Sequence, residues 1–315
     1  MDDRQLREIE SAAVEFAYGA GRILLDHFRK PLRIEFKGRD NRNPVTDADY
    51  AADAYLREAI AQRFPDHAII SEETGSTEAT SEFTWIIDPL DGTTNYLHGL
   101  PVFGVIITVV AGDRPAAAAI FTPSIREPQG VVTHARTGGG AFAGEEQLNL
   151  RTEHAPEVDR MLGAVPGAFL RMFRFDKAVR RRLGDIRTFG STAYESAMAA
   201  QGVFDYLVFN HSHIWDVAAG VLLVQEAGGA VMCKQGRNAK EWRPFDRFVI
   251  EGAGDSPTAA QLRNWRGSLI MGASQAAPFI ANGITHRPYR VRRAWMRLKQ
   301  RLPNLPTRPA PKPSP

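Results

Sequence analysis

The chain has 315 residues, 43% of them hydrophobic, so it can bury a core of ordinary size and does not have the composition of a disordered protein. Its single cysteine, Cys233, allows no intrachain disulfide and lacks the Cys and His neighbours of a zinc site, which favours a reducing compartment. The net charge of +3 is unevenly divided, because residues 286–315 hold nine of the 39 Lys and Arg and no acid, leaving 30 basic and 36 acidic side chains in residues 1–285.

The first half of the sequence predicts helices followed by strands. Apolar residues at helical spacing predict an amphipathic helix over about the first 28 residues. Thr46 and Asp47 can cap a second helix, which Pro65 ends. Short β-type runs separated by turn residues then predict a meandering sheet, with strands at 68–70, 85–87, 102–110, 116–121 and 130–134.

The second half alternates helix and strand. The pattern predicts a helix over 193–202, a strand over 206–209, a helix over 217–227 and a strand over 230–233, with Gly228 and Gly229 after the second helix. Because no repeat or long linker separates the halves, we expect residues 1–285 to form one catalytic domain of two lobes, about 1–150 and 151–285. Residues 286–315 are basic and Pro-rich, which predicts a tail that is disordered or docked on a partner.

Nothing in the sequence indicates export or membrane insertion. The first ten residues are charged and lead into no apolar segment of the signal-peptide type. The longest apolar run, residues 102–110, is far shorter than the roughly 20 residues that span a bilayer. We therefore expect a soluble, cytoplasmic protein with no membrane span.

The strongest motif is WIIDPLDGTTNYLHGLP, residues 85–101. Its first residues predict a buried strand that delivers Asp88 to its end, and we expect Pro89 to turn the chain so that Asp91 returns to the same side. The two carboxylates and the Leu90 carbonyl can then converge. Residues 92–94 follow, where N–H groups at a helix start can face an anion. Oxygen ligands beside such a phosphate cradle suit Mg²⁺.

Other acids also lie at the ends of predicted elements. Two acids in a DG-type turn most simply cap that turn, so Asp88 and Asp91 alone would prove little. The further acids are Glu72 and Glu73 after a predicted strand, Asp47 and Asp49 at a helix start, and Asp216 before an apolar helix. Each by itself is more often a cap or a solvated acid. Their shared position at element ends is better explained by convergence on one cation site.

Three motifs, SEE, WIIDPLDGTTNY and WDVAAGVLLVQEAGG, occur here in the order found in the inositol monophosphatase family, which the chain resembles over roughly residues 5–275. The resemblance implies a first Mg²⁺ held by Glu72, Asp88 and the Leu90 carbonyl. It implies a second Mg²⁺ held by Asp88, Asp91 and Asp216.

The resemblance also implies roles in catalysis and substrate binding. Thr93 with Asp47 would position and help to deprotonate the attacking water, so that the implied catalytic residues are Asp47, Thr93 and Glu72. The Gly92 and Thr93 amides would bind the phosphate, and Lys37 is a weaker loop match. The implied substrate-binding residues are Asp91, Gly92, Thr93, Gly190, Ser191, Thr192 and Asp216.

The fold implied by the resemblance is α/β, a layered α-β-α-β-α sandwich of the inositol monophosphatase and fructose-1,6-bisphosphatase type. The implied activity is Mg²⁺-dependent hydrolysis of the phosphate monoester of a small metabolite, with two or three Mg²⁺ per site. Inhibition by Li⁺ and a homodimer are implied as well.

Electrostatics gives a separate reason for more than one metal ion. The five acids Asp47, Glu72, Asp88, Asp91 and Asp216 are joined by a phosphate monoester with a charge of almost −2. At about 4 Å and an effective dielectric constant near 20, each like-charge pair costs about 4 kcal/mol. Divalent ions would reverse the sign of this pocket. They would also polarise the phosphoryl oxygens and lower the pKa of water, which favours direct in-line attack over a phosphoenzyme.

The alcohol that is released stays open. Inositol-using relatives commonly carry a Glu seven positions before the aspartate of the WD motif, where this chain has Phe209. Phe209 is either a substrate contact or a residue of the core. His211 and His213 are leaving-group candidates, although such loop histidines are more often plain surface residues. Histidinol phosphate and other sugar or nucleotide phosphates are alternative substrates.

A function of another class is a non-catalytic platform that binds RNA or protein through the basic tail. Basic amphipathic segments bind anionic surfaces, so contact of the tail with nucleic acid or another anionic surface is a second hypothesis. The acidic body, by contrast, suits divalent cations and argues against an extended polyanion site outside the tail.

Overall fold

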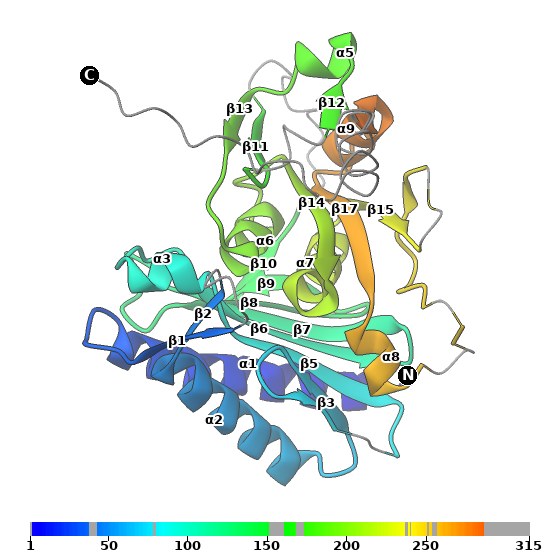
Figure 1. Ribbon diagram of the computed structural model, residues 1–315. Coiled ribbons are helices and arrows are strands. Elements are labelled where there is room, and N and C mark those ends of the chain that lie inside the picture. Colours follow the sequence, from blue (N-terminus) through cyan, green and yellow to red (C-terminus); the bar gives the residue numbers. More distant parts are fainter. Residues whose placement is uncertain are drawn as a thin grey trace, which may run out of the picture.

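Helix and sheet layers alternate through the molecule in the order helix, sheet, helix, sheet, helix (Figure 1). This computed structural model describes residues 2–37, 43–77, 80–150, 161–167, 173–236, 239, 241–250, 252–253 and 257–286. The predicted α/β layered sandwich is confirmed.

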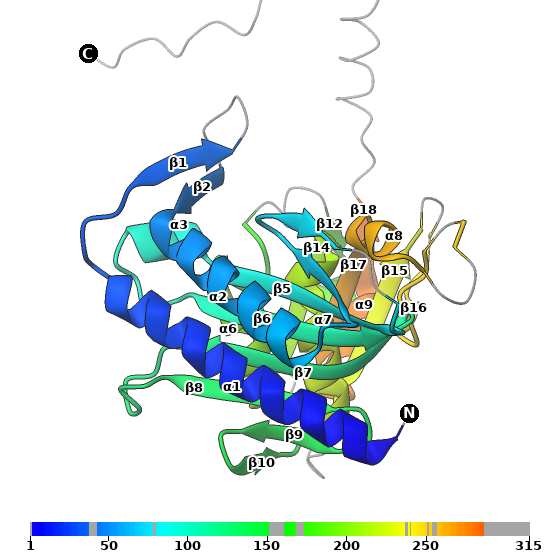
Figure 2. The same cartoon turned by 90° about the horizontal axis from the view of Figure 1, so that it is seen from below.

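The first layer is a pair of helices, α1 (Asp3–His27) and α2 (Asp47–Arg63), which cross one face of the first sheet (Figure 2). Asp2 caps α1, whose apolar stripe is fully buried. The α2 helix begins at a capping box, in which Thr46 and Asp49 hydrogen-bond to each other's backbone. Both predicted helices are therefore confirmed, with the expected cap at Thr46.

The first sheet positions most of the acids. Its eight described strands, in spatial order, are β10 (Glu146–Leu148), β9 (Gly140–Ala143), β8 (Val131–Arg136), β7 (Arg114–Thr122), β6 (Gly104–Ala111), β5 (Phe83–Asp91), β3 (Ala68–Ser71) and β4 (Gly75–Ser76). The neighbours β5 to β10 pair antiparallel, as the predicted meander requires. Only β3 and β5 run parallel, which brings their carboxyl ends to the same edge.

The alternation of β5 determines which face its acids take. Trp85 and Ile87 pack against the α1 and α2 side, whereas Ile86 belongs to the core on the opposite side. Asp88 lies two residues after Ile86, so its side chain is on the same face of the sheet and points toward the central helices.

The central helices α6 (Thr192–Ala200) and α7 (Ile214–Glu226) lie between the two sheets (Figure 1). The α7 helix is buried nearly all round, as its sequence WDVAAGVLLVQ predicts. The second sheet has the spatial order β13 (Asp185–Arg187), β11 (Leu162–Ala164), β14 (Tyr206–His213), β17 (Arg266–Gly272), β15 (Ala230–Gln235) and β16 (Arg243–Pro244). The outer helices α5 (Lys177–Arg180) and α9 (Ala276–Gly283) pack on its far face.

Short elements complete the fold. They are β1 (Ile34–Lys37) paired with β2 (Asn43–Thr46), α3 (Thr93–Leu97), α8 (Ala259–Arg263), and β12 (Phe173–Phe175) paired with β18 (Ile284–His286). The sequence pattern did not predict β1, β11, β17 or α9. The division into two lobes stays a prediction, and residues 287–315 of the predicted tail lie outside the described residues. No helix in the described ranges is long and apolar enough to cross a membrane.

A buried ionic cluster ties α1 to the sheet. Glu10 accepts hydrogen bonds from Arg136 at 3.0 Å and lies 2.8 Å from Nδ1 of His134. Glu10 and Arg136 are both less than a tenth exposed. Burial raises the pKa of Glu10, but the hydrogen bonds from His134 and Arg136 more than offset this and lower it.

We expect Glu10→Gln to lower the free energy of unfolding by about 3 kcal/mol, because it leaves Arg136 buried with only the exposed Asp3 as a partner. Glu15→Gln, also in α1, removes the exposed Glu15–Arg63 pair and should cost less than about 1 kcal/mol. Urea unfolding of both variants measures the difference, and equal losses would contradict the role of the buried cluster.

Candidate active site

Three carboxylates from distant parts of the chain meet at the shared edge of β3 and β5. Glu72 lies in the turn after β3, Asp88 lies on β5, and Asp216 lies in the first turn of α7. One ligand oxygen from each lies within 4.8 Å of those of the other two. The parallel pairing of β3 and β5 brings Glu72 beside Asp88, and the buried α7 supplies Asp216 from the layer above.

The neighbouring carboxylates raise the pKa values of Asp88 and Asp216. Asp88 is 2% exposed, and burial together with the charges of Glu72, Asp91 and Asp216 raises its pKa well above the ordinary value. Burial raises the pKa of Asp216 to about 7, with further increases from Asp91 and Glu72 and an opposing hydrogen bond from the His213 amide. The cluster therefore has an excess of negative charge that a bound cation would relieve.

Asp91 is held beside this cluster by a β-bulge and by the start of α6. The register of β5 against β6 shifts between Asp88 and Asp91, so an extra residue re-aims the side chains. The expectation that Pro89 turns the chain was wrong, because β5 continues through Asp91 and the bulge does the re-aiming. The Asp91 carboxylate accepts hydrogen bonds from the Ser191 hydroxyl, the Thr192 hydroxyl (2.9 Å) and the Ala193 amide (2.9 Å). Burial still raises its pKa.

Gly92 and Thr93 form the turn between β5 and α3. Gly92 has φ +84°, and a Cβ there would lie 2.9 Å from the Val102 carbonyl oxygen and 3.0 Å from the Ser191 Cβ, so only glycine fits. The Thr93 hydroxyl donates to the Leu90 carbonyl at 3.1 Å. Thr93 and the Leu90 carbonyl are thus adjacent, as the sequence interpretation requires.

The turn that carries Glu72 is fixed by residues that sequence reasoning missed. Asp53, on the buried face of α2, accepts hydrogen bonds from the hydroxyls of Ser71 and Thr74. Arg263 of α8 donates to the backbone carbonyls of Ser71 and Glu72. An acid between the apolar positions of an amphipathic helix was the available signal for Asp53.

The remaining predicted acids lie to one side of the cluster. Asp49 is buried at the capping box, and burial raises its pKa to about 7. Hydrogen bonds from Thr46 oppose this increase, whereas the charge of Glu73 adds to it. Asp47 is exposed as the first residue of α2. Burial raises the pKa of Tyr96 in α3, and the charges of Asp49 and Asp47 raise it further. Lys37 ends β1, and its side chain is outside the described part.

The wall formed by residues 190–192 is clamped from two sides. The Asn95 amide donates to the carbonyls of Val102 and Phe189, both at 2.8 Å. Glu195 accepts from the Phe189 amide at 3.0 Å, and burial raises its pKa to about 7 although that hydrogen bond opposes the increase. Sequence reasoning missed Asn95 and Glu195, although Asn95 lies within the strongest motif.

Cationic and aromatic side chains border Asp216 on the opposite side. Arg263 and Arg266 lie over the Trp215 ring, 5.1 and 5.5 Å from its centroid. Burial and both arginine charges lower the pKa of His213 to about 4, so it is neutral at pH 7. His211 is exposed with φ +56°. Phe209 is 2% exposed and packs in the central core, so the core interpretation of this residue is confirmed.

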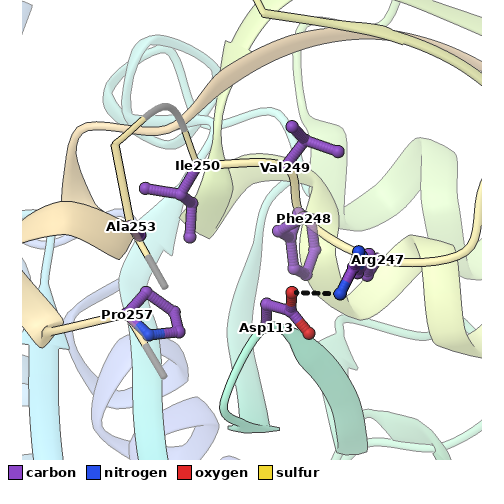
Figure 3. A pocket seen from close by; sticks show the side chains of 7 residues that line it. All are labelled: Asp113, Arg247, Phe248, Val249, Ile250, Ala253 and Pro257. Atoms are coloured by element: carbon purple, nitrogen blue, oxygen red, sulfur yellow. Dashed lines mark ion pairs between the residues drawn. The ribbon is translucent and has the colours of Figure 1, made fainter. Parts of the chain in front are cut away.

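A separate cavity of about 190 Å³ lies away from these acids (Figure 3). Asp113, in the β6–β7 turn, closes one side of it by an ion pair with Arg247 at 3.5 Å. The lining is otherwise mostly apolar, with Phe248 and Ile250 facing the space. It contains none of the clustered carboxylates, so it does not belong to the candidate active site.

The donor set fits a hard divalent cation. Carboxylate oxygens and a backbone carbonyl are the ligands that Mg²⁺ prefers, and a buried acid cluster with raised pKa values is stabilised by positive charge. No Cys or His lies in the cluster, which argues against a zinc site of the usual type.

Comparisons with known proteins agree with this chemistry. The model of the inositol monophosphatase family matches residues 5–267. Inositol monophosphatase 2 of Solanum lycopersicum is 35% identical over 246 residues, which cover 73% of this chain and 89% of that protein. The Nus factor SuhB of Escherichia coli is 33% identical over 226 residues, or 70% of this chain and 82% of that protein. The solved structure of inositol monophosphatase from Anabaena is 25% identical with a TM-score of 0.66, covering 88% of this chain and 95% of that chain.

The raised pKa of Asp216 predicts a pH dependence of stability in EDTA. Between an unfolded pKa near 3.8 and a folded pKa of about 7, the folded state binds more protons, so the metal-free protein loses stability as the pH rises. Asp216→Asn removes this contribution. As the pH rises from 5 to 8, the free energy of unfolding of the variant, measured in urea, should increase by on the order of 2 kcal/mol relative to that of the unsubstituted protein. A difference that does not change with pH would contradict the raised pKa.

Proposed function

The chain belongs to the inositol monophosphatase family and is a phosphoric monoester hydrolase, and from this premise we propose that it hydrolyses the phosphate monoester of a small metabolite in a Mg²⁺-dependent reaction, by direct attack of water. The observation that carries the proposal is the meeting of Glu72, Asp88 and Asp216 in one cluster around the buried Asp88. A phosphate dianion would be repelled by this cluster alone, so substrate binding requires bound cations.

We assign the metal ligands as follows. Glu72, Asp88 and the Leu90 carbonyl would hold one Mg²⁺, and Asp88, Asp91 and Asp216 a second, with two or three ions per site. Bound Mg²⁺ would neutralise the carboxylates, polarise the phosphoryl oxygens and lower the pKa of water. The hydrogen bonds from Ser191, Thr192 and Ala193 orient Asp91 for this role.

Residues of the chain would orient the water and the phosphate. The Thr93 hydroxyl donates its hydrogen to the Leu90 carbonyl, so its oxygen is left to accept a hydrogen from the attacking water. Asp47, exposed at the start of α2, would take the proton as general base together with Thr93. Glu72 completes this set beside the water, and the Gly92 and Thr93 amides would bind phosphoryl oxygens.

The leaving group would rest against residues 190–192. Asp91 accepts hydrogen bonds from Ser191 and Thr192 of this wall, and we propose that Asp91 and Asp216 each accept a hydrogen bond from a substrate hydroxyl. Phe209 is in the core and offers no polar contact, so the polyol that is released is not defined by an acid at that position. Histidinol phosphate and other sugar or nucleotide phosphates therefore stay alternatives to inositol phosphate.

A substrate screen tests the choice among these compounds. The purified protein with Mg²⁺ would be assayed for phosphate release from inositol phosphates, histidinol phosphate, fructose 1,6-bisphosphate and adenosine 3′,5′-bisphosphate. A kcat/KM at least tenfold higher for one compound identifies its class. Absence of Mg²⁺-dependent release from all of them would contradict the proposed function. Li⁺ inhibition and a homodimer stay predictions of the family resemblance, and a cytoplasmic location stays a prediction of the sequence.

Asp91→Asn tests the metal assignment. We expect it to lower kcat/KM by more than about 100-fold, because the neutral amide keeps the hydrogen-bonding shape but loses the ligand charge. Asp113→Asn, in the β6–β7 turn beside the separate cavity, is the matched control and should keep normal turnover. Circular dichroism of both variants checks the fold, and normal turnover in Asp91→Asn would refute the assignment.

A further inference from the structure

A strongly basic surface lies on the outermost layer, around α5 and the strands on either side of it. We call residues 173–187 the basic face. Within it, two acids, Asp176 and Asp185, are outnumbered by cations. Six basic side chains, all exposed, belong to it: Arg174, Lys177, Arg180, Arg181, Arg182 and Arg187.

Most of these charges have no counter-ion in the described part of the chain. Arg187 lies 3.8 Å from Asp185, which is the one ion pair of the basic face among described residues. The Asp176 carboxylate accepts from the Val179 amide at 2.8 Å and so caps α5. Arg174, Lys177 and the three consecutive arginines at 180–182 therefore present their charge to solvent.

The basic tail leaves the fold at this same surface. Strand β18, the last described element, pairs antiparallel with β12, and Arg174 lies opposite Thr285 while Phe173 lies opposite His286. The remaining residues, 287–315, contain nine Lys and Arg and no acid. His286, the last described residue, therefore lies beside the basic face, and the nine cations follow it in the sequence.

Charge is segregated between this surface and the rest of the molecule. Outside the basic face and the tail, the chain has 24 basic and 34 acidic side chains, a net charge of −10. Residues 173–187 therefore form a segment with a net charge of +4 within an otherwise acidic body. In Figure 1, α5 and β12 lie at the end of the molecule opposite α1 and α2, whereas the carboxylate cluster lies at β5 and α7. A polyanion could occupy the basic face without entering the acidic site.

We propose that the basic face binds the phosphodiester backbone of a nucleic acid, without base specificity. Five of its six cations are arginines, whose planar guanidinium matches phosphate in a bidentate fashion. Six cations spread over one surface exceed what a single small anion can contact. Two copies of the basic face would repel each other, so a symmetric contact of this face with itself is disfavoured.

The composition of the basic face favours nucleic acid over a membrane. Membrane-surface elements combine cations with exposed apolar side chains that enter the lipid boundary. The exposed large hydrophobic residues of the described chain lie elsewhere, at Ile34, Phe36, Tyr50, Leu100, Ile125, Val203 and Val249. The basic face thus offers charge without an apolar anchor.

The test is fluorescence anisotropy of a labelled 20-nucleotide oligo(U) RNA with the full chain between 50 and 200 mM salt. The triple substitution Arg180→Gln, Arg181→Gln and Arg182→Gln removes up to three phosphate contacts. Each lost contact should lower the slope of log K against log salt by about 0.7, so the slope should fall by about 2. If the two proteins bind equally at 1 M salt, this change of slope makes the affinity of the triple variant about 50-fold lower than that of the unsubstituted chain at 0.15 M salt.

A matched control carries the same change at three exposed arginines outside the basic face, Arg22, Arg33 and Arg126. It should bind the RNA as the unsubstituted chain does. Equal binding by the two triple variants would overturn the proposal. So would binding to phosphatidylserine vesicles by a chain that does not bind the RNA at 50 mM salt. Phosphatase turnover should be unchanged in both variants, so failure of the proposed hydrolase activity and failure of RNA binding are separate results.

Discussion

Repulsion among the buried carboxylates of Glu72, Asp88 and Asp216 is the interaction on which the candidate active site depends. Left alone, three such groups would move apart or bind protons, as the raised pKa values of Asp88 and Asp216 indicate. The fold holds them together through the parallel pair β3 and β5 and the buried helix α7. Close packing in these layers keeps the acids from moving apart, so positive charge from outside the chain is the remaining source of relief.

The supporting residues show that the site extends well beyond its acids. Asp53 and Arg263 fix the turn of Glu72, the start of α6 fixes Asp91, and Asn95 with Glu195 fixes the adjacent wall. Of these contacts, Asp53 with Thr74 joins α2 to the turn after β3, and Asp91 with Ala193 joins β5 to α6, so both link neighbouring layers of the sandwich. Displacement of a layer would therefore move a carboxylate or the wall, which links the stability of the fold to the geometry of the site.

The sequence predicted the helices α1, α2, α6 and α7 and the meander because their apolar periodicity is long and regular. It predicted the clustered acids because Glu72 and Asp88 follow apolar runs and Asp216 precedes one. It did not predict the bulge at Asp88 and Asp91, since bulges depend on pairing with β6. Asn95 was missed because one of its backbone partners, the Phe189 carbonyl, is distant in sequence, and β17 was missed because its neighbours in the sheet come from other parts of the chain.

The most direct test of the central claim is the position of a divalent cation in crystals of the protein soaked with Mn²⁺, an oxygen-preferring substitute for Mg²⁺ that scatters anomalously. The account predicts anomalous density between Glu72, Asp88 and Asp216, and its loss in crystals of Asp88→Asn. Strong density only at other acids, with none in this cluster, would contradict it.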